Sequence, residues 1–240
     1  MPDTRIDNLI HLAKDHMRRS HDPAHGLDHA ARVAAVLERF AADLHLSEDE
    51  RMALILAGWW HDVSRTITKR PSIILMLFID DALSALMLWR ATIRYRVFGT
   101  VAGMSTRLIF CKSLGTGRLF TRLFLRKKTR VLLNILKDAD TLDVMNVPRI
   151  QLVCKLVETS SIYAFGYRVL AWYNFKTNLF KMNTEMGQRY LQEFTADLAA
   201  WIMKPEVWQW HLKHFGHVWV EQTFMNINYR LEYIERLNTS

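Results

Sequence analysis

The chain has 240 residues and a mass of 28.2 kDa, and 50% of its residues are hydrophobic while 23% are charged. This composition excludes a disordered chain, and nine Gly and five Pro exclude collagen-like or linker-rich architecture. Two Cys residues cannot build a disulfide framework or a cysteine-rich zinc site. The first residues contain no apolar segment of the secretory type, so we expect a cytoplasmic protein.

The net charge of +8 is unevenly distributed along the chain. Residues 82–137 contain no Asp or Glu, and the excess of positive charge lies in this segment, which includes a basic insert at about 90–130. Its basic residues are Arg90, Arg94, Arg96, Arg107, Lys112, Arg118, Arg122, Arg126, Lys127, Lys128, Arg130 and Lys137. Such a segment favours anionic partners, namely nucleotides, nucleic acid or acidic lipid.

Helical periodicity dominates the sequence, and alternating strand patterns are scarce. We therefore expect an all-α fold. The pattern predicts helices at about 5–19, 28–44, 47–63, 72–89, 127–145, 147–160, 184–203 and 217–237. Within the third of them, Ser47 and Glu50 fit a capping box. Residues 96–120 carry four Gly and give no clear pattern.

The most apolar stretch, 72–89, has the two carboxylates Asp80 and Asp81 at its centre. A bilayer tolerates central carboxylates badly, so the sequence favours a buried helix over a membrane span.

Three predicted helices carry metal-ligand side chains on an apolar face. His29 lies four residues before Val33 and begins the apolar stripe of its helix. His61 and Asp62 each lie at the C-terminal end of an apolar stripe on the predicted helix 47–63. Asp140 follows Leu136 by four residues and Leu133 by seven. Buried carboxylates need a cation, so these four side chains predict a site for a divalent metal ion. Their mixed nitrogen and oxygen donors leave Mn²⁺, Fe²⁺, Co²⁺, Ni²⁺, Mg²⁺ and Zn²⁺ open.

At these positions the sequence resembles the HD-domain superfamily of metal-dependent phosphohydrolases. His29-Ala30-Ala31-Arg32-Val33 is similar to the first ligand segment of the family, whose form is His-x-x-Arg-Val. His61-Asp62 is similar to the pair that names the family, and Asp138-Ala139-Asp140-Thr141-Leu142-Asp143 to its closing element. The resemblance covers about residues 20–165.

The resemblance implies a helical domain, a metal ion held by His29, His61, Asp62 and Asp140, and hydrolysis of a phosphate ester or anhydride, often in a nucleotide. Relatives often carry a His-Glu pair where this chain has Asp80-Asp81. No His lies between His61 and His211, which favours one metal ion over two.

Catalytic roles are expected for Asp62 and for Asp81, which would position or deprotonate water. Substrate-binding roles are expected for a further set of residues, namely His25, Arg32, Arg65, Arg90 and Arg94. Asp138 and Asp140 point to different faces of one helix, and the apolar stripe selects Asp140 as the ligand. Asp143 shares the helix face of Asp140 and is expected to hydrogen-bond to the metal ligands without binding the ion itself.

We expect one HD-type domain at 1–165 and a helical, aromatic-rich C-terminal extension at 166–240 packed on it. The aromatic surplus is compatible with a homodimer surface. His211, His214 and His217 are spaced by three residues, but the surrounding aromatic residues favour packing over a second metal site. The alternative to a phosphohydrolase of small nucleotides is a phosphodiesterase or non-catalytic protein that binds nucleic acid or an anionic surface through the basic insert.

Overall fold

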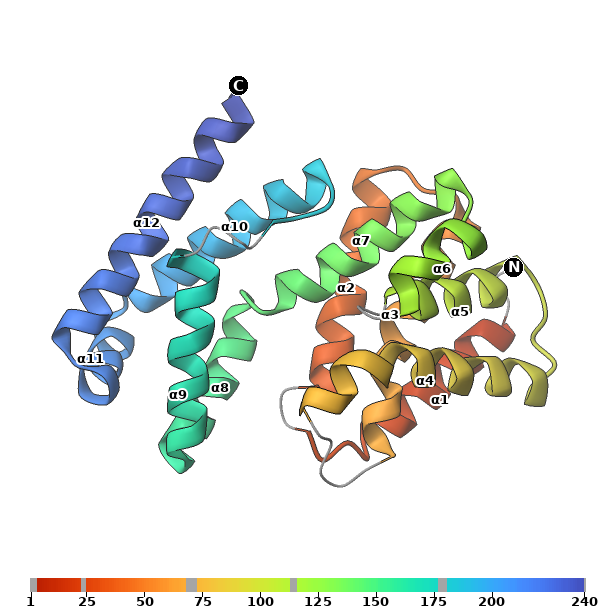
Figure 1. Ribbon diagram of the computed structural model, residues 1–240, viewed down its shortest axis with the longest axis horizontal. Helices are drawn as coiled ribbons and strands as arrows, with labels where there is room; N and C mark the ends of the chain where they lie inside the picture. The colour runs from red at the N-terminus through yellow and green to blue at the C-terminus, as the bar shows by residue number, and fades with distance from the viewer. Residues whose placement is uncertain (1–3, 23–24, 68–72, 113–115, 177–180, 240) are drawn as a thin grey trace. The chain divides into compact units, whose positions relative to one another are not determined.

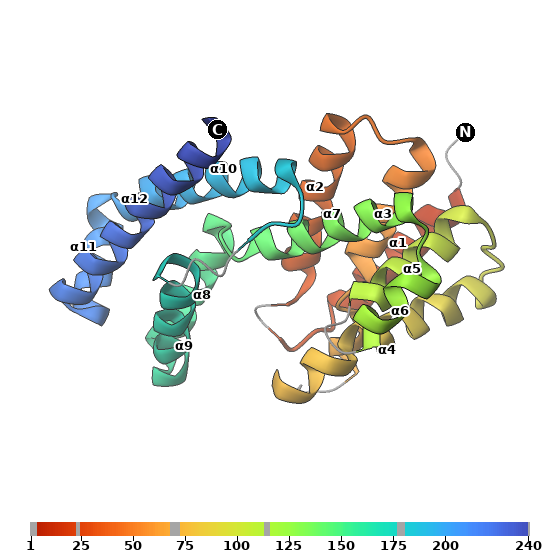
Figure 2. The same ribbon diagram turned by 45° about the horizontal axis from the view of Figure 1, so that its top comes forward.

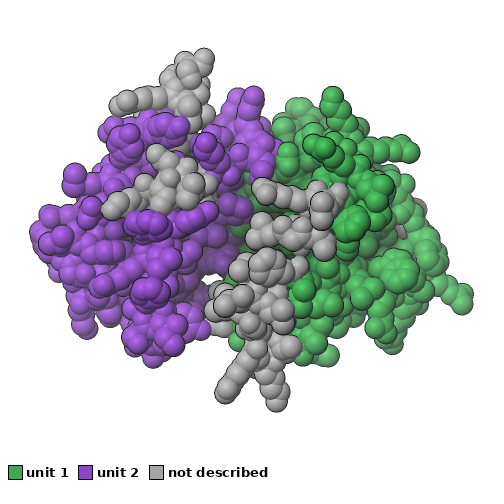
Figure 3. Space-filling model, in the orientation of Figure 1, with its two compact units in different colours: residues 1–140 green, residues 141–240 purple. Residues whose placement is uncertain are grey.

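A computed structural model describes residues 4–22, 25–67, 73–112, 116–176 and 181–239, and helices make up its regular structure (Figure 1). The predicted all-α fold is therefore confirmed. The chain divides into two compact units, Met1–Asp140 and Thr141–Ser240, which Figure 3 shows in different colours. This division falls near Asp140, whereas the sequence pattern placed it at 165. None of the helices in the described part combines the length and apolar composition of a bilayer span.

Unit 1 is built around one helix that is buried on all sides. Its elements are α1 (Thr4–Met17), α2 (Leu27–Asp43), α3 (Glu48–Trp60), the short 3-10 helix η1 (Val63–Thr66), α4 (Ile73–Arg94), α5 (Thr100–Lys112), α6 (Thr116–Phe124) and α7 (Lys127–Asp143). Every residue of α3 from Ala53 to Trp60 is buried, and the helix packs against α1, α2 and α5. Figures 1 and 2 show α3 surrounded by the other helices of this unit. A helix that is apolar all round belongs in a core, and it fixes whatever follows its C-terminus.

The structure confirms the capping box at the start of α3. The backbone N–H of Ser47 donates to Oε2 of Glu50 at 3.1 Å, and the Ser47 side chain caps the backbone of the first turn. These bonds satisfy amide groups that a helix start leaves without partners.

Replacing Ser47 with Ala is expected to lower the free energy of unfolding by about 1 kcal/mol, because the first turn loses its cap. Urea unfolding followed by circular dichroism measures the change. His11→Ala, on the exposed face of α1, is the matched control and should have a smaller effect. Equal losses in the two variants would contradict a capping role for Ser47.

The segment that gave no clear sequence pattern forms two helices, α5 and α6. The helix α5 packs against both α3 and α4, so its buried residues do not fall on a single narrow stripe. Ser105 is one of them, and its hydroxyl donates to the carbonyl of Ala53 in α3 at 2.9 Å. The preceding helix α4 runs on past the predicted end at 89 and stops before Arg96, whose φ of 55° is incompatible with a helix.

Unit 2 is a second helical assembly with an aromatic core. Its elements are α8 (Val147–Thr159), α9 (Ser161–Ala171), the π-helical turn η2 (Trp172–Lys176), α10 (Glu185–Ile202), α11 (Pro205–Phe215) and α12 (His217–Thr239). Tyr167 stacks on Phe215, and its hydroxyl lies 2.9 Å from Nε2 of the buried His211. His214 stacks on Trp210 with ring centroids 4.3 Å apart. These contacts favour packing roles for the histidines.

Candidate metal centre

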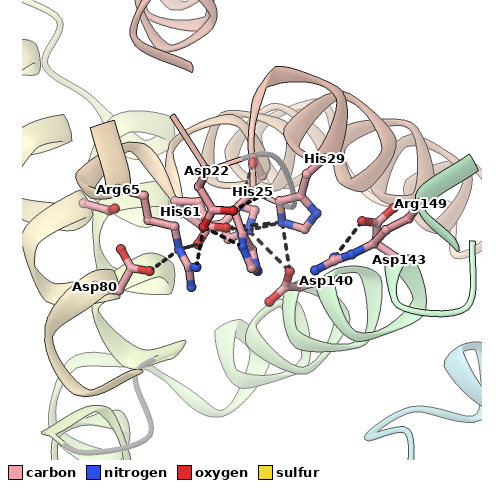
Figure 4. A network of polar contacts seen from close by, with 12 residues as sticks. Asp22, His25, His29, His61, Arg65, Asp80, Asp140, Asp143 and Arg149 are labelled. Atoms are coloured by element: carbon pink, nitrogen blue, oxygen red, sulfur yellow. Dashed lines mark hydrogen bonds and ion pairs between the residues drawn. The ribbon is translucent and has the colours of Figure 1, made fainter. Parts of the chain in front are cut away.

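Three helices of unit 1 bring the predicted ligands together. His29 lies in the first turn of α2, and His61 is the residue that caps the C-terminus of α3. Asp62 follows directly, and Asp140 lies in the last turn of α7. His29 and His61 are fully buried and Asp62 is nearly so. Figure 4 shows the two imidazoles and the Asp140 carboxylate pointing toward one another.

The two imidazole nitrogens lie close to each other and to one oxygen of each carboxylate. The Nε2 atoms of His29 and His61 are 3.1 Å apart. Oδ1 of Asp140 lies 3.3 Å from Nε2 of His29 and 3.4 Å from Nε2 of His61. Oδ2 of Asp62 lies 3.3 and 3.6 Å from the same two nitrogens.

These spacings fit a common metal ion. An ion bonded to nitrogen and oxygen at about 2.0–2.2 Å separates neighbouring ligand atoms by about 2.8–3.6 Å. Within the described residues, His29, His61 and Asp140 form the one group whose donor atoms all lie within 4.8 Å of one another, and Asp62 lies outside this group although its Oδ2 is near both nitrogens. The donor set, two imidazoles and two carboxylates, suits a divalent first-row metal or Mg²⁺ and leaves the choice open.

The backbone of α3 fixes the orientation of His61. Its Nδ1 lies 2.7 Å from the carbonyl oxygen of Gly58, to which it donates its proton. This hydrogen bond turns Nε2 toward His29, Asp62 and Asp140, as in metal-binding histidines whose other ring nitrogen donates to a carbonyl. The same geometry allows an N–H···N hydrogen bond from His29 when no ion is bound.

Asp62 is held as a carboxylate by its surroundings. Burial alone would raise its pKa, but His61, the hydrogen bond with His29 and the charge of Arg65 hold the pKa well below its usual range. The pKa of Asp140 is also well below its usual range, because Lys112 and the two histidines outweigh the effect of burial. Both oxygen donors are therefore ready to bind a cation without first losing a proton.

Arg65 lies among three carboxylates. Its Nε donates to Oδ2 of Asp80 at 2.6 Å and lies 3.5 Å from Oδ1 of Asp62. Its Nη1 is 3.4 Å from Oδ2 of Asp22. Burial would lower the pKa of Arg65, but these carboxylates raise it, so the guanidinium stays charged. The substrate-binding role predicted for Arg65 stays a prediction, and the contacts show that it braces Asp62.

Asp80 extends this support to the next helix. Its carboxylate accepts hydrogen bonds from Ser64 and from Arg65, so it ties the start of α4 to the turn after His61. The backbone N–H of Ser64 donates to the hydroxyl of Ser84 at 3.0 Å, a second link between the same elements. Burial, reinforced by the charge of Asp62, raises the pKa of Asp80.

Lys112, at the end of α5, joins the centre although the sequence analysis did not select it. Its Nζ lies 2.9 Å from Oδ2 of Asp140 and 3.2 Å from Oδ1 of Asp81. Burial would lower the pKa of Lys112, but Asp140 and Asp81 raise it. Lys112 follows the buried Leu108 by four residues and so lies on the buried face of α5, which the packing of this helix shows and the sequence alone does not.

Asp81 and Asp140 therefore share the ammonium group of Lys112. Asp81 is nearly buried, and burial raises its pKa although Lys112 acts in the opposite direction. The predicted catalytic pair of Asp62 and Asp81 thus flanks the cluster, with Asp62 among the donor atoms and Asp81 behind Lys112.

His25, for which the sequence predicts a substrate-binding role, lies beside His29. Its ring meets the ring of His29 edge to face, with centroids 5.4 Å apart. Its Nδ1 lies 2.9 Å from Oδ2 of Asp22, which orients it, and its side chain is about a quarter exposed. The ring can therefore reach a molecule that approaches the centre from solvent.

Two of the other predicted site residues line a separate cavity. Arg90 and Arg94 line a cavity of about 510 Å³ with Trp60 and Tyr95, and none of the four ligands lines it. Arg32 lies one turn beyond His29 in α2 and is partly exposed. At the end of α7, the buried Asp143 pairs with Nη1 of Arg149 at 2.9 Å, as Figure 4 shows. The roles predicted for these residues stay predictions.

Asp138 and Asp140 differ as the helical spacing predicted. Oδ1 of Asp140 lies within 3.4 Å of Nε2 of both His29 and His61, whereas the contacts described above for these two rings do not include the buried Asp138.

Comparison of the chain with models of protein families, with curated proteins and with solved structures found no match.

Proposed function

We propose that this protein is a metal-dependent phosphohydrolase of the HD type, which cleaves a phosphate ester or anhydride of a nucleotide or a similar small phosphate. The observation that carries the proposal is the convergence of the Nε2 atoms of His29 and His61 with one carboxylate oxygen of Asp140, 3.1–3.4 Å apart, beside an oxygen of Asp62 that lies 3.3–3.6 Å from the same two nitrogens. The three motifs that resemble the HD superfamily contain these same four residues, which supports the choice of reaction.

A single divalent ion would be held by His29, His61, Asp62 and Asp140. In such a site an ion polarises a phosphoryl oxygen and makes water more acidic. The charges of the two carboxylates balance those of the ion, and Lys112 balances Asp81. The group as a whole is then close to neutral before an anionic substrate arrives.

Residues around the donor atoms have distinct tasks in this proposal. Arg65 fixes Asp62 through Oδ1 and leaves Oδ2 facing the histidines. Asp81 has a pKa raised by burial, so its carboxylate accepts a proton from water more readily than an exposed one. Lys112 positions Asp81 and offers an ammonium group to a phosphoryl oxygen, while His25 offers an imidazole.

Release of phosphate and pyrophosphate from nucleoside mono-, di- and triphosphates tests the proposal. Wild-type protein with added Mn²⁺ is expected to release one of these products, and the identity of the product shows which bond breaks. His61→Ala should reduce release to the background rate, because it removes a donor atom that the others cannot replace.

The matched control is His217→Ala, since His217 is exposed and belongs to α12 of unit 2. This variant should keep the wild-type rate. Equal release by wild type and His61→Ala would contradict the proposed mechanism. No release by the wild type from any of these substrates would favour the alternative of a protein that binds an anionic partner.

A further inference from the structure

The helix α4 has a second apolar face that the core of unit 1 does not cover. Its inner face buries Ala85, Leu88 and Ala91. On the opposite side Leu86, Trp89 and Ile93 are about half exposed and lie within an arc of about 60°. Scattered exposed apolar residues are normal on a protein surface, whereas three such residues side by side on one helix indicate a binding surface for an apolar partner.

The end of α6 continues this apolar surface. Leu123 is 74% exposed, and Phe124 is also exposed. An almost entirely apolar groove of about 390 Å³ joins Phe124 to Leu86 and Trp89 of α4, with Phe110 of α5 in its wall. Leu86, Trp89, Ile93, Leu123 and Phe124 are called the α4–α6 surface below.

Positive charge borders the α4–α6 surface. Arg90 and Arg94 lie beside the stripe on α4, Arg107 lines the groove, and Arg126 and Lys127 directly follow the end of α6. The surface and these cations all belong to the segment 82–137, which has no acidic residue. A second copy of the same surface would repel this one, so charge excludes the symmetric self-pairing of the segment.

We propose that the α4–α6 surface docks unit 1 onto a bilayer that contains anionic phospholipids. Leu123 and Phe124 enter the boundary between headgroups and acyl chains, Trp89 lies at the interface, and the flanking Arg and Lys side chains meet lipid phosphates. Aliphatic side chains favour this occupant over nucleic acid, because bases stack on aromatic rings and gain little from exposed Leu and Ile.

Sedimentation of the full-length protein with vesicles tests the docking. The protein is expected to bind vesicles of phosphatidylcholine and phosphatidylserine in equal amounts, and to bind pure phosphatidylcholine vesicles much more weakly. Arg126→Gln combined with Lys127→Gln should weaken binding by about fivefold for each charge removed. Trp89→Ala combined with Leu123→Ala should weaken it by about tenfold or more, because apolar area is lost.

The matched control is Ile162→Ala combined with Val218→Ala, which removes two apolar side chains of unit 2 that are each 78% exposed. This variant should bind mixed vesicles like the wild type, and all variants should retain the wild-type circular dichroism spectrum. Failure of the wild type to sediment with mixed vesicles would overturn the proposal. Binding of a single-stranded oligonucleotide that is lost in the Trp89 and Leu123 variant, without vesicle binding, would assign the surface to nucleic acid instead.

Discussion

Replacing Asp140 with Asn is expected to lower the affinity for a divalent cation by more than about a hundredfold. Mutation of residues that only hydrogen-bond to metal ligands already lowers metal affinity by about tenfold to a hundredfold. The Asn side chain keeps the size of Asp but loses the charge that faces His29 and His61. It also leaves Lys112 with a weaker partner. Isothermal titration of metal-free protein with Mn²⁺ and with Co²⁺ measures the loss, and metal analysis of the purified protein checks the stoichiometry of one ion per chain.

Asp138→Asn provides a stringent control for this result. Asp138 is buried on the same helix two residues away, but it does not face the imidazoles. The control variant should keep the wild-type affinity as long as its circular dichroism spectrum is unchanged. A folded Asp138→Asn protein that loses the metal as completely as Asp140→Asn would show that the ligand face of α7 is assigned wrongly.

Replacing Lys112 with Met is expected to lower the free energy of unfolding of the metal-free protein by about 3–5 kcal/mol. The side chain of Lys112 is 13% exposed, and its ammonium is shared between Asp81 and Asp140. Met has a similar volume, so the main change is the loss of the cation from between two largely buried carboxylates. Urea unfolding measures the cost, with Lys127→Met, on the exposed start of α7, as a control that should change little.

The deficit of Lys112→Met should also depend on pH. Burial raises the pKa of Asp81, and removal of Lys112 takes away the cation that opposes this rise. A carboxyl group whose pKa is higher in the folded state binds more protons there, so folding is favoured as the pH falls. Relative to wild type, the variant should therefore regain stability as the pH falls from neutral toward about pH 4, the usual range of an Asp carboxyl. A deficit that stays constant or grows over this range would contradict burial of a charged Asp81.

Much of the metal centre could be predicted from local patterns. The positions of His29, His61 and Asp62 at helix ends follow from the spacing of apolar residues, because a polar side chain in register with an apolar stripe must face the interior. The same reasoning separated Asp140 from Asp138 on one helix. The capping box at Ser47 could also be predicted, since it depends on residues within one turn.

The support around the centre could not be predicted in this way. Arg65 contacts Asp80 and Asp22, which are far from it in the sequence, so only the packing of η1 against α4 brings these side chains together. The position of Lys112 beside Asp140 could not be predicted for a similar reason. The other described basic residues of its segment are largely exposed. The burial of Lys112 results from the packing of α5 against α3 and α4.

The sequence by itself determined that this protein is helical and that His29, His61, Asp62 and Asp140 lie on the inner faces of their helices, because both properties follow from periodicity and from the cost of burying an uncompensated charge. Only the tertiary structure decided which cations stabilise the carboxylates, that Arg90 and Arg94 line a separate cavity, and that α4 and α6 share an exposed apolar surface. These features depend on contacts between distant segments, and the identity of a residue does not specify which distant segment will lie against it.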